Sequence, residues 1–320
     1  MAVPLITEAD VRRLLPMREA VALMRRVFED LGTGKAQNLP RRRLRMPSGA
    51  MLHMLAGAFG AYFGTKVYSS HPRYGANFQA MLYDASDARP LAMFEANALG
   101  QIRTGAASGF ATDLLARPEA RTLAVIGTGF QARTQIEAML VVRPFERVRV
   151  WGRDAERRIV FARECSEACG VAVEAAESAE QAVRGADVIV TVTSAKDPVL
   201  DAAWVDAGAH VNAIGSNNPA RRELPAELIQ AAGLIAVDSL EQARMESGDL
   251  ILALDEQGWS DPRLVELADL ASGKRTWERT AAPTIFKSNG LGVEDVAAAG
   301  FVYERAITAQ DPPPPHPSLS

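Results

Sequence analysis

The second half of the chain alternates continuous apolar runs with segments of helical periodicity. The first run is Thr122–Ile126, and a segment with helical spacing follows it over 130–141. Further strands are predicted at 147–151, 171–173, 187–192, 210–214 and 234–238, with helical segments over 154–169 and 179–184 between them. Apolar strands that alternate with helices are typical of a parallel sheet covered on both faces. The pattern predicts a doubly wound α/β domain.

The first half has a different pattern. Thr7 precedes Asp10 as a helix cap, and helices are expected over 17–31 and 98–116. Between them, over 39–95, short runs of large apolar residues are separated by turns rich in Gly, Pro, Asp and Ser, which favours an antiparallel or mixed sheet. We therefore expect an α+β domain over 1–117, the doubly wound domain over 118–292, and a C-terminal helix within 293–320 that packs back on the first domain.

Composition narrows the class of protein. The 320 residues are 48% hydrophobic, and 35 Lys and Arg against 39 Asp and Glu give a net charge of −4, which argues against a nucleic-acid-binding protein. The longest stretch free of charged residues, 46–65, contains Pro47, His53 and four glycines. The N-terminus lacks a signal peptide, so we expect no membrane segment and a cytoplasmic protein.

Cys165 and Cys169 are interpreted as buried thiols rather than a metal or redox pair, and no metal site is expected. The proline-rich tail 311–317 is typical of a solvated end.

A glycine-rich loop follows the first apolar strand of the second half. Gly127, Gly129 and Ala132 form the pattern G-x-G-x-x-A between that strand and a helix. Gly127 permits a tight turn, Gly129 lets the backbone approach a pyrophosphate, and the helix N-terminus attracts the anion. The alternative is a glycine turn that serves packing alone, but the surrounding strands and helices favour dinucleotide binding through the residues Gly127, Thr128, Gly129, Phe130 and Gln131.

The end of the second strand should select between the two nicotinamide dinucleotides. An NAD site usually has an Asp or Glu at this place, but the sequence here is Trp151-Gly152-Arg153-Asp154. Arg153 suits a 2′-phosphate, which favours NADP(H), with NAD(H) possible. The alternative is a surface arginine paired with Asp154.

The remaining candidate residues are cationic. Arg41, Arg43 and Arg45 share one face of a predicted strand, while Lys66 and Arg103 lie among small and apolar residues. Each of these could be a solvated surface charge. For Lys66 and Arg103, however, an unpaired charge in apolar surroundings is costly, and a bound carboxylate would satisfy both. Lys66 could also donate a proton, since burial beside arginines lowers the pKa of a lysine.

These residues belong to a series of motifs that resembles the ornithine cyclodeaminase/mu-crystallin family. The motifs are Lys66, Arg103-Thr104-Gly-Ala-Ala-Ser, Ile126-Gly-Thr-Gly-Phe-Gln131, Asn212-Ala-Ile-Gly-Ser, Pro219 with Glu223-Leu, Val237-Asp-Ser and Phe286-Lys-Ser288-Asn-Gly290, and they span nearly the whole chain. The resemblance implies a homodimer with a Rossmann-type dinucleotide-binding domain and a domain for substrate binding and dimerisation. It also implies that Arg41, Lys66 and Arg103 bind a substrate carboxylate. Near the cofactor it places Thr104, the 127–131 loop, Arg153, Thr191 and Ser288.

The chain also departs from that family. Cyclodeaminases and the family's alanine dehydrogenase have an Asp where this chain has Asn217, which cannot act as a general base at neutral pH. A common Lys shortly after Pro219 is Arg221 here, and His53 stands where cyclodeaminases have a Glu. His53 is either a proton donor or an ordinary strand histidine. The loss of two carboxylates that would meet a diamine weakens the ornithine interpretation.

These observations together favour an NADP(H)-dependent oxidoreductase that acts on a small amino or imino acid. It would reduce the C=N bond of an α-imino acid or cyclic ketimine carboxylate, or run the reverse oxidation, with Lys66, Arg103 and Asn217 as catalytic candidates. Arg41 and His53 join Lys66 and Arg103 as substrate-binding candidates. Two alternatives remain open: an ornithine cyclodeaminase with bound NAD, and a dinucleotide-binding protein without catalysis.

Overall fold

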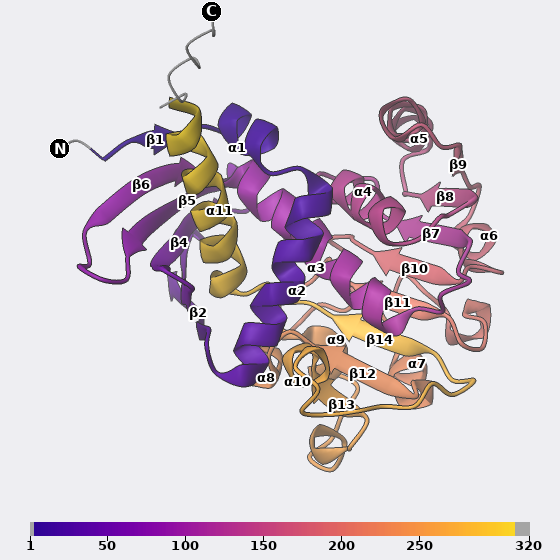
Figure 1. Ribbon diagram of the computed structural model, residues 1–320. Coiled ribbons are helices and arrows are strands. Elements are labelled where there is room, and N and C mark those ends of the chain that lie inside the picture. The colour runs from indigo at the N-terminus through magenta and orange to yellow at the C-terminus, as the bar shows by residue number, and fades with distance from the viewer. Residues whose placement is uncertain (1–2, 311–320) are drawn as a thin grey trace, which may run out of the picture.

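Two β-sheets form the framework of the molecule, and they are joined by a long buried helix (Figure 1). The computed structural model describes residues 3–310, and within that range the sheets have six and eight strands. The first half contributes β1 (Leu5–Ile6), α1 (Glu8–Leu14), α2 (Met17–Thr33), β2 (Gln37–Arg45), β3 (Met51–Phe59), β4 (Tyr62–His71), β5 (Gly75–Asp84), β6 (Pro90–Glu95) and α3 (Asn97–Leu115). Of these, α3 is the joining helix, buried along almost its whole length.

The second half supplies the eight-stranded sheet and its helices. Its elements are β7 (Thr122–Ile126), α4 (Ala132–Val142), β8 (Arg147–Trp151), α5 (Ala155–Cys169), β9 (Val173–Ala175), α6 (Ala179–Val183), β10 (Val188–Thr191), β11 (His210–Ala213), α7 (Ala226–Ala231), β12 (Leu234–Val237), α8 (Leu240–Glu246), α9 (Gly248–Ile251), β13 (Leu264–Glu266), α10 (Leu267–Ala271), β14 (Thr284–Lys287) and α11 (Gly292–Gln310). Short 3₁₀ turns lie at Ala202–Trp204 and Gly258–Ser260.

The eight-stranded sheet is parallel throughout, in the order β13-β12-β14-β11-β10-β7-β8-β9. The chain moves from β7 outward to β8 and β9, and then returns to place β10 on the other side of β7. The carboxyl ends of β7 and β10 therefore flank the point where the strand order reverses, which is where such folds bind ligands. The prediction of a doubly wound parallel sheet is confirmed.

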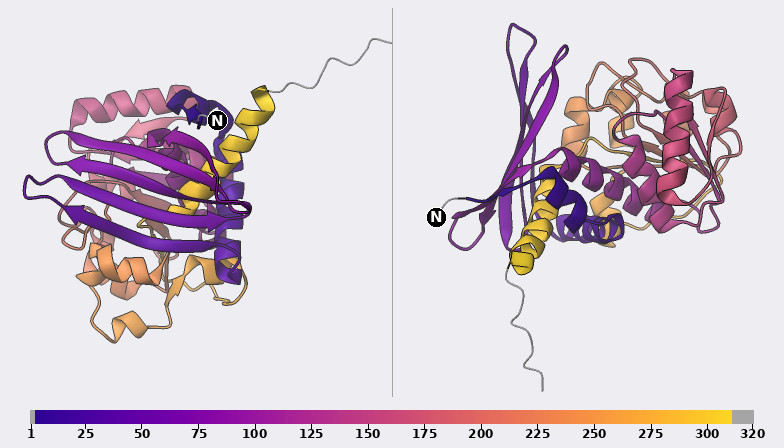
Figure 2. Two further views of the ribbon diagram at one scale, coloured as in Figure 1. Left: turned by 90° about the vertical axis from the view of Figure 1, so that its left-hand side faces the viewer. Right: turned by 90° about the horizontal axis from the view of Figure 1, so that it is seen from above.

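The six-stranded sheet is mixed, because β2 to β6 run antiparallel and β1 pairs parallel with β6. Its inner face packs against α11 and α3, while Figure 2 shows its other face uncovered. The register fixes which side chains point inward: Lys66 of β4 lies opposite Leu55 of β3 and Ala80 of β5, all three buried. Since neighbours across strands share a face, the buried side of this sheet carries Lys66 toward the rest of the molecule.

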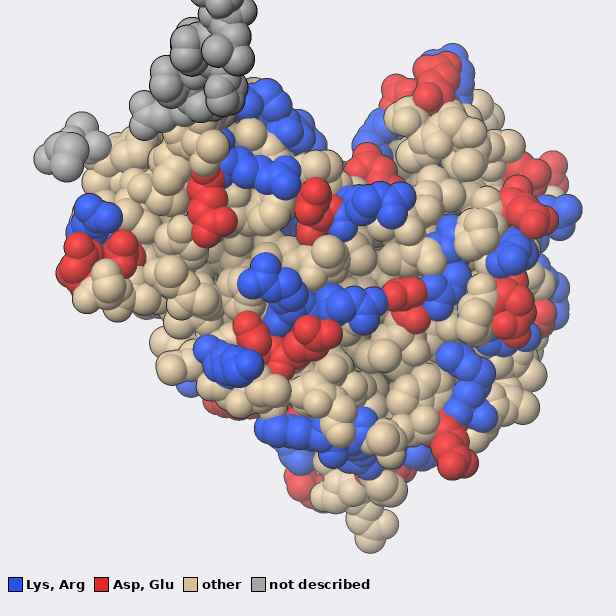
Figure 3. Space-filling view, viewed as in Figure 1, with Lys and Arg blue, Asp and Glu red and all other residues tan. Residues whose placement is uncertain are grey.

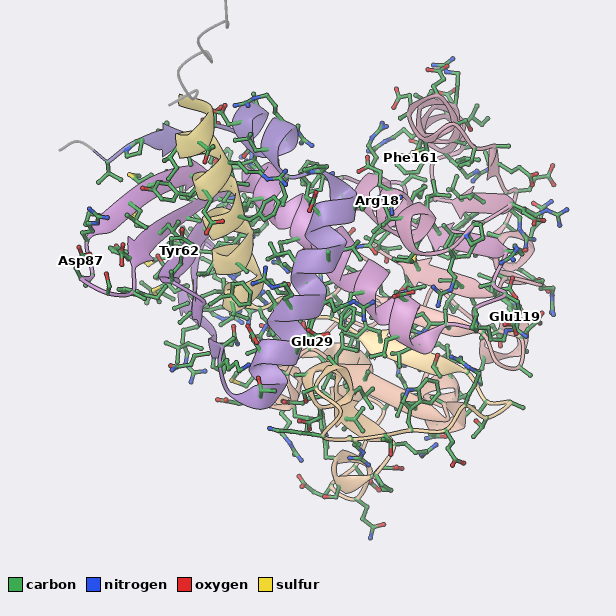
Figure 4. All side chains as sticks on the ribbon, in the orientation of Figure 1. Arg18, Glu29, Tyr62, Asp87, Glu119 and Phe161 are labelled. Atoms are coloured by element: carbon green, nitrogen blue, oxygen red, sulfur yellow. The ribbon has the colours of Figure 1, made fainter. Side chains whose placement is uncertain are left out.

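Helix α11 packs against β3 and β4, at the opposite end of the sequence from these strands. The approach is close because two glycines meet there: a Cβ on Gly57 would lie 2.5 Å from Val293 Cα, and one on Gly292 would lie 2.6 Å from the Ala56 carbonyl oxygen. Farther along the helix, Tyr62 of β4, labelled in Figure 4, donates a hydrogen bond from its hydroxyl to Glu304 at 3.0 Å. These contacts hold α11 against the inner face of the sheet at its N-terminal turn and again near Glu304.

Most expected elements are found within one or two residues of their predicted bounds, but not all. The strand predicted at 171–173 is shifted, since β9 spans Val173–Ala175. The sequence pattern also missed β14, which lies between β11 and β12 in the sheet, because its four residues follow Pro283 and end on a lysine. The proline-rich tail lies outside the described residues.

The surface charges and the helices can be compared with the expectations about nucleic-acid binding and membrane segments. In Figure 3, Lys and Arg side chains are interspersed with Asp and Glu over the face shown. Within residues 3–310, none of the helices has the length and apolar character needed to cross a bilayer.

Candidate active site

Two adjoining cavities lie at the carboxyl ends of the parallel strands, and the smaller of them is also lined by residues of the six-stranded sheet. The smaller has a volume of about 330 Å³ and the larger about 940 Å³. Phe130, Gln131, Ile214 and Gly215 line both of them, so one wall separates the two spaces. The arrangement suits two ligands that bind side by side, one in each cavity.

The glycine loop lines the larger cavity. Gly127 has a φ of +122°, and a Cβ there would lie 2.5 Å from the Val192 carbonyl oxygen, so the turn after β7 requires glycine. A Cβ on Gly129 would meet no atom within 4 Å, which leaves its backbone open to the cavity. The loop leads into the N-terminus of α4, where free N–H groups attract an anion.

These features fit a dinucleotide. Thr128, Phe130 and Gln131 line the same cavity, and Arg153 lies at its β8 side. The carboxylate of Asp154 accepts a hydrogen bond from the Arg157 backbone N–H and thereby caps α5. Asp154 therefore has a structural role at the helix start, and Arg153 is left as the charged residue that follows β8 in the lining of this cavity.

The smaller cavity is cationic. Lys66, Arg103 and Arg41 line it, and all three are buried. Lys66 Nζ donates to Asp295 Oδ1 at 2.8 Å, and Arg103 binds Glu294 Oε2 through Nη1 at 2.6 Å and Asp295 Oδ1 through Nε at 3.1 Å. The expectation that a bound carboxylate would supply the counter-charge is therefore corrected: two acidic residues of α11 already pair with these cations.

The surroundings of Lys66 tune its protonation. Burial lowers its pKa to about 8, with Asp295 opposing that shift and Arg103 adding to it. The pKa of Glu294 is raised by burial to about 7, whereas Arg103 and Lys66 hold the pKa of Asp295 below its ordinary value despite burial. A lysine of this kind is largely protonated at neutral pH and can release its proton at modest cost.

Arg41 and Arg43 of β2 tie the six-stranded sheet to α8. Glu246 Oε1 accepts a hydrogen bond from Arg41 Nη1 at 2.6 Å, and Glu246 Oε2 forms an ion pair with Arg43 Nη2 at 2.5 Å. Arg41 Nη2 also donates to the carbonyls of Asn289 and Gly290, so its guanidinium is largely engaged within the chain. Arg103, which also lines the cavity, uses Nη1 and Nε for its ion pairs, and its Nη2 makes no hydrogen bond within the described residues.

An apolar wall faces the cations. Leu55, Tyr68 and Phe78 line it, and Lys66 Nζ lies 5.3 Å from the centre of the Phe78 ring. His53 stacks on Tyr68 with ring centroids 4.1 Å apart, behind the residues that line the cavity. Burial, together with Arg43, lowers the pKa of His53 to about 4. Of the two interpretations of His53, the stacking on Tyr68 and the lowered pKa favour the strand histidine over the proton donor.

Asn217 lies on the loop between β11 and α7, at the edge of the smaller cavity. Its carbonyl accepts a hydrogen bond from Arg43 Nη2 at 3.0 Å. The same loop is held from beneath by Lys287, which is fully buried and donates to the carbonyls of Ala213 and Ser216. Sequence reasoning missed Lys287, although its motif was noted, because the strand that carries it was not recognised.

Two buried carboxylates complete this support. Asp249 lies 3.1 Å from Lys287 Nζ and accepts the backbone N–H groups of Glu223 and Leu224. The Glu223 carboxylate accepts from Thr191, from Thr193 and from the Gly215 N–H. The segment from Gly215 to Glu223 is thus fixed at both ends.

Three further candidates occupy different positions. Thr104 lines the smaller cavity, with its hydroxyl bonded to the Gly100 carbonyl, and Ser288 lines it while donating to Asp238. Thr191 lines neither cavity: it is buried at the end of β10 and its hydroxyl donates to Glu223. The expected cofactor contact of Thr191 is therefore corrected to a support for the loop, while Thr193, two residues on, lines the larger cavity.

Comparison with known proteins matches this geometry. The family model for the ornithine cyclodeaminase/mu-crystallin family matches residues 3–310. The Δ1-pyrroline-2-carboxylate reductase of Bacillus cereus is 41% identical over 229 residues, which cover 71% of this chain and 70% of that protein.

Two solved structures are similar over nearly the whole chain. One is the Thermococcus litoralis Δ1-pyrroline-2-carboxylate reductase in complex with NADH and L-proline, with 30% identity, a TM-score of 0.91 and coverage of 96% and 98%. The other is an archaeal alanine dehydrogenase dimer with bound NAD, with 30% identity, a TM-score of 0.89 and coverage of 97% and 98%. The resemblance noted from the motifs is confirmed.

Proposed function

Because this chain belongs to the ornithine cyclodeaminase/mu-crystallin family, we propose that it is an NADP(H)-dependent reductase of α-imino acids, cyclic ketimine carboxylates foremost. The observation that carries the proposal is the buried pair of Lys66 and Arg103 in a cavity that shares a wall with the glycine-loop cavity. The reductases among its relatives, and the NADH and L-proline bound in one of them, support the same substrate class.

The residues that line the smaller cavity have proposed roles that follow from their chemistry. Arg103 Nη2 and Lys66 attract the substrate carboxylate, with Arg41 adding positive charge behind them. A reduced nicotinamide dinucleotide, when bound through the glycine loop, supplies the hydride for the imine carbon. Lys66 supplies the proton for the imine nitrogen. Leu55, Tyr68 and Phe78 accept an apolar ring. The side chain of Asn217 orients the substrate by hydrogen bonding but takes no proton.

The preference for NADP(H) rests on Arg153. Arg153 lines the cavity just after β8, at the sequence position where a carboxylate would select the unphosphorylated ribose. A 2′-phosphate would gain a charge-assisted hydrogen bond there.

The assembly proposed is a homodimer formed by the uncovered face of the six-stranded sheet. By the strand register, this face carries the exposed apolar side chains Leu39, Leu44, Met54, Phe63 and Met93. An apolar patch of this kind marks an interface. A dimer in the related alanine dehydrogenase supports this proposal.

The test is NADPH oxidation with Δ1-pyrroline-2-carboxylate and Δ1-piperideine-2-carboxylate as substrates. We expect turnover with both rings. Absence of turnover with these, and with imines formed from pyruvate and an amine, would refute a reductase. Release of proline and ammonia from ornithine with tightly held NAD would instead identify a cyclodeaminase, and dinucleotide binding without any turnover would identify a binding protein.

A further inference from the structure

Lys66 owes its place to a residue at the far end of the chain. Its ammonium lies 2.8 Å from Asp295 Oδ1 on the first turn of α11, and both side chains are almost fully buried. The same Oδ1 accepts from Arg103 Nε at 3.1 Å. One carboxylate oxygen therefore holds both the lysine and the arginine of the cavity.

The backbone is shaped to bring these groups together. Gly57 and Gly292 let α11 approach the sheet until their backbones touch, which places Asp295 above Lys66. On the opposite side, a Cβ on Gly100 of α3 would lie 2.5 Å from Lys66 Nζ. Any larger residue at position 100 would displace the ammonium from this place.

Every element packed around Lys66 contributes to its electrostatic surroundings. The opposite residues on β3 and β5 are the apolar Leu55 and Ala80, and the Phe78 ring lies beneath the ammonium. The charged and titratable groups are Asp295 and Glu294 on α11, Arg103 on α3, Arg41 on β2 with its partner Glu246 on α8, and Tyr68 on β4. Asp295 is the anion in direct contact with Lys66, while Glu294 binds Arg103 and Glu246 binds Arg41.

We propose that Asp295 is the positioning residue of the reaction, which holds the Lys66 ammonium at the cavity and keeps it charged as the proton donor. This inference rests on the proposed reductase function. In the step it serves, the imine carbon receives a hydride from the reduced dinucleotide and the imine nitrogen receives a proton from Lys66 Nζ. The products are the amine, the oxidised dinucleotide and a neutral lysine, which regains its proton from water. Asp295 takes no part in bond making.

The shared oxygen also couples the two tasks of the site. Because Asp295 Oδ1 binds Lys66 and Arg103 at once, the proton donor and the carboxylate clamp keep a fixed spacing. The second oxygen, Oδ2, is buried without a hydrogen-bond partner, so within the described part of the chain Lys66 and Arg103 are the only side-chain donors to this carboxylate.

The experiment compares the pH dependence of kcat for imine reduction in the wild type, Asp295→Asn and Glu294→Gln. In the wild type, the rate should fall as the pH rises through the pKa of Lys66, which is about 8. Removing the Asp295 charge takes away the main influence that keeps Lys66 protonated, so this alkaline limb should move to lower pH by about one unit or more. Glu294→Gln is the matched control: it removes a neighbouring carboxylate that binds Arg103, and should raise KM while shifting the limb far less.

A second readout needs no turnover. The affinity for pyrrole-2-carboxylate, a flat and unreactive carboxylate, should weaken at a lower pH in Asp295→Asn than in the wild type, as measured by calorimetry. If Asp295→Asn does not fold, Asp295→Glu decides: it should keep the wild-type limb but lose at least about tenfold in kcat, since the longer side chain displaces Lys66.

The outcomes separate this inference from the function on which it rests. A wild type that reduces no imine refutes the proposed function. A wild type that does so, with an alkaline limb that stays in place in Asp295→Asn, or with an unchanged kcat in Asp295→Glu, overturns the role of Asp295.

Discussion

Single residues at the two cavities differ in how far the sequence could identify them. Lys66 and Arg103 could be identified because charged residues among small and apolar neighbours need a reason to be there. Their partners Glu294 and Asp295 could not, since about 190 residues or more separate them from the cations and only the folded chain brings them close. The sequence left two interpretations of His53 open, because its stacking and its arginine neighbours are not visible there.

The first prediction concerns Arg153. Arg153→Gln should lower kcat/KM for NADPH by about 10- to 100-fold, because a charge-assisted contact to the 2′-phosphate is lost. The value for NADH should change by less than about threefold, since that ribose carries no phosphate. Steady-state kinetics with both dinucleotides measures the ratio, and Arg163→Gln, an exposed arginine farther along α5, is the control. Equal losses for NADPH and NADH would contradict the assignment.

The second prediction concerns His53 and stability. In the folded protein its pKa is lowered to about 4 from 6.5, so the unfolded chain binds more protons between these values. The free energy of unfolding should therefore fall as the pH drops from about 6.5 toward 4, and His53→Gln should lessen that fall. Buried His210, with a pKa lowered to about 3, leaves a remaining acid dependence. Urea midpoints at pH 7.5 and pH 5 provide the measurement; an identical loss in both proteins would show that His53 does not contribute.

At the scale of elements, the loop that carries Asn217 is held by the short strand β14. The apolar pattern identified β7, β10, β11 and β12 almost to the residue because nearly every residue of each is buried. The bounds of β8 were also predicted, although its burial alternates along the strand. It missed β14 because a central strand that ends in a buried lysine does not have that pattern. The lysine is stable there only because Asp249 and two carbonyls surround it.

Lys287→Met should accordingly destabilise the protein by about 3–5 kcal/mol, since it leaves the Asp249 carboxylate buried without its partner. Adding Asp249→Asn removes that charge and keeps an acceptor for the Glu223 and Leu224 N–H groups, so the double variant should regain part of the loss. Chemical denaturation of the single and double variants provides the free energies. Strictly additive losses would show that Lys287 and Asp249 do not act as a pair.

At the scale of the whole molecule, each sheet contributes a different part of the site. One presents the glycine loop, the other carries Lys66, and α3 and α11 bring them to a common wall. The sequence indicated both sheets and the helix between them, but not that the uncovered face of the six-stranded sheet would gather its exposed apolar residues, because that requires the strand register.

Phe63→Glu should disrupt the proposed dimer, because it buries a charge in the apolar interface. Light scattering should give twice the 34.4 kDa chain mass for the wild type and close to one chain mass for the variant. Glu119→Gln, an exposed change on the far side of the molecule in Figure 4, should leave the mass unchanged. A wild type that is monomeric, or a variant with the wild-type mass, would contradict the assignment of this face.

The most direct test of the reductase follows the hydrogen itself. With NADPH deuterated at the transferred C4 position and Δ1-pyrroline-2-carboxylate, mass spectrometry and NMR of the product should show proline that carries one deuterium, at C2. Proline without deuterium, or no proline at all, would contradict hydride transfer between the two cavities.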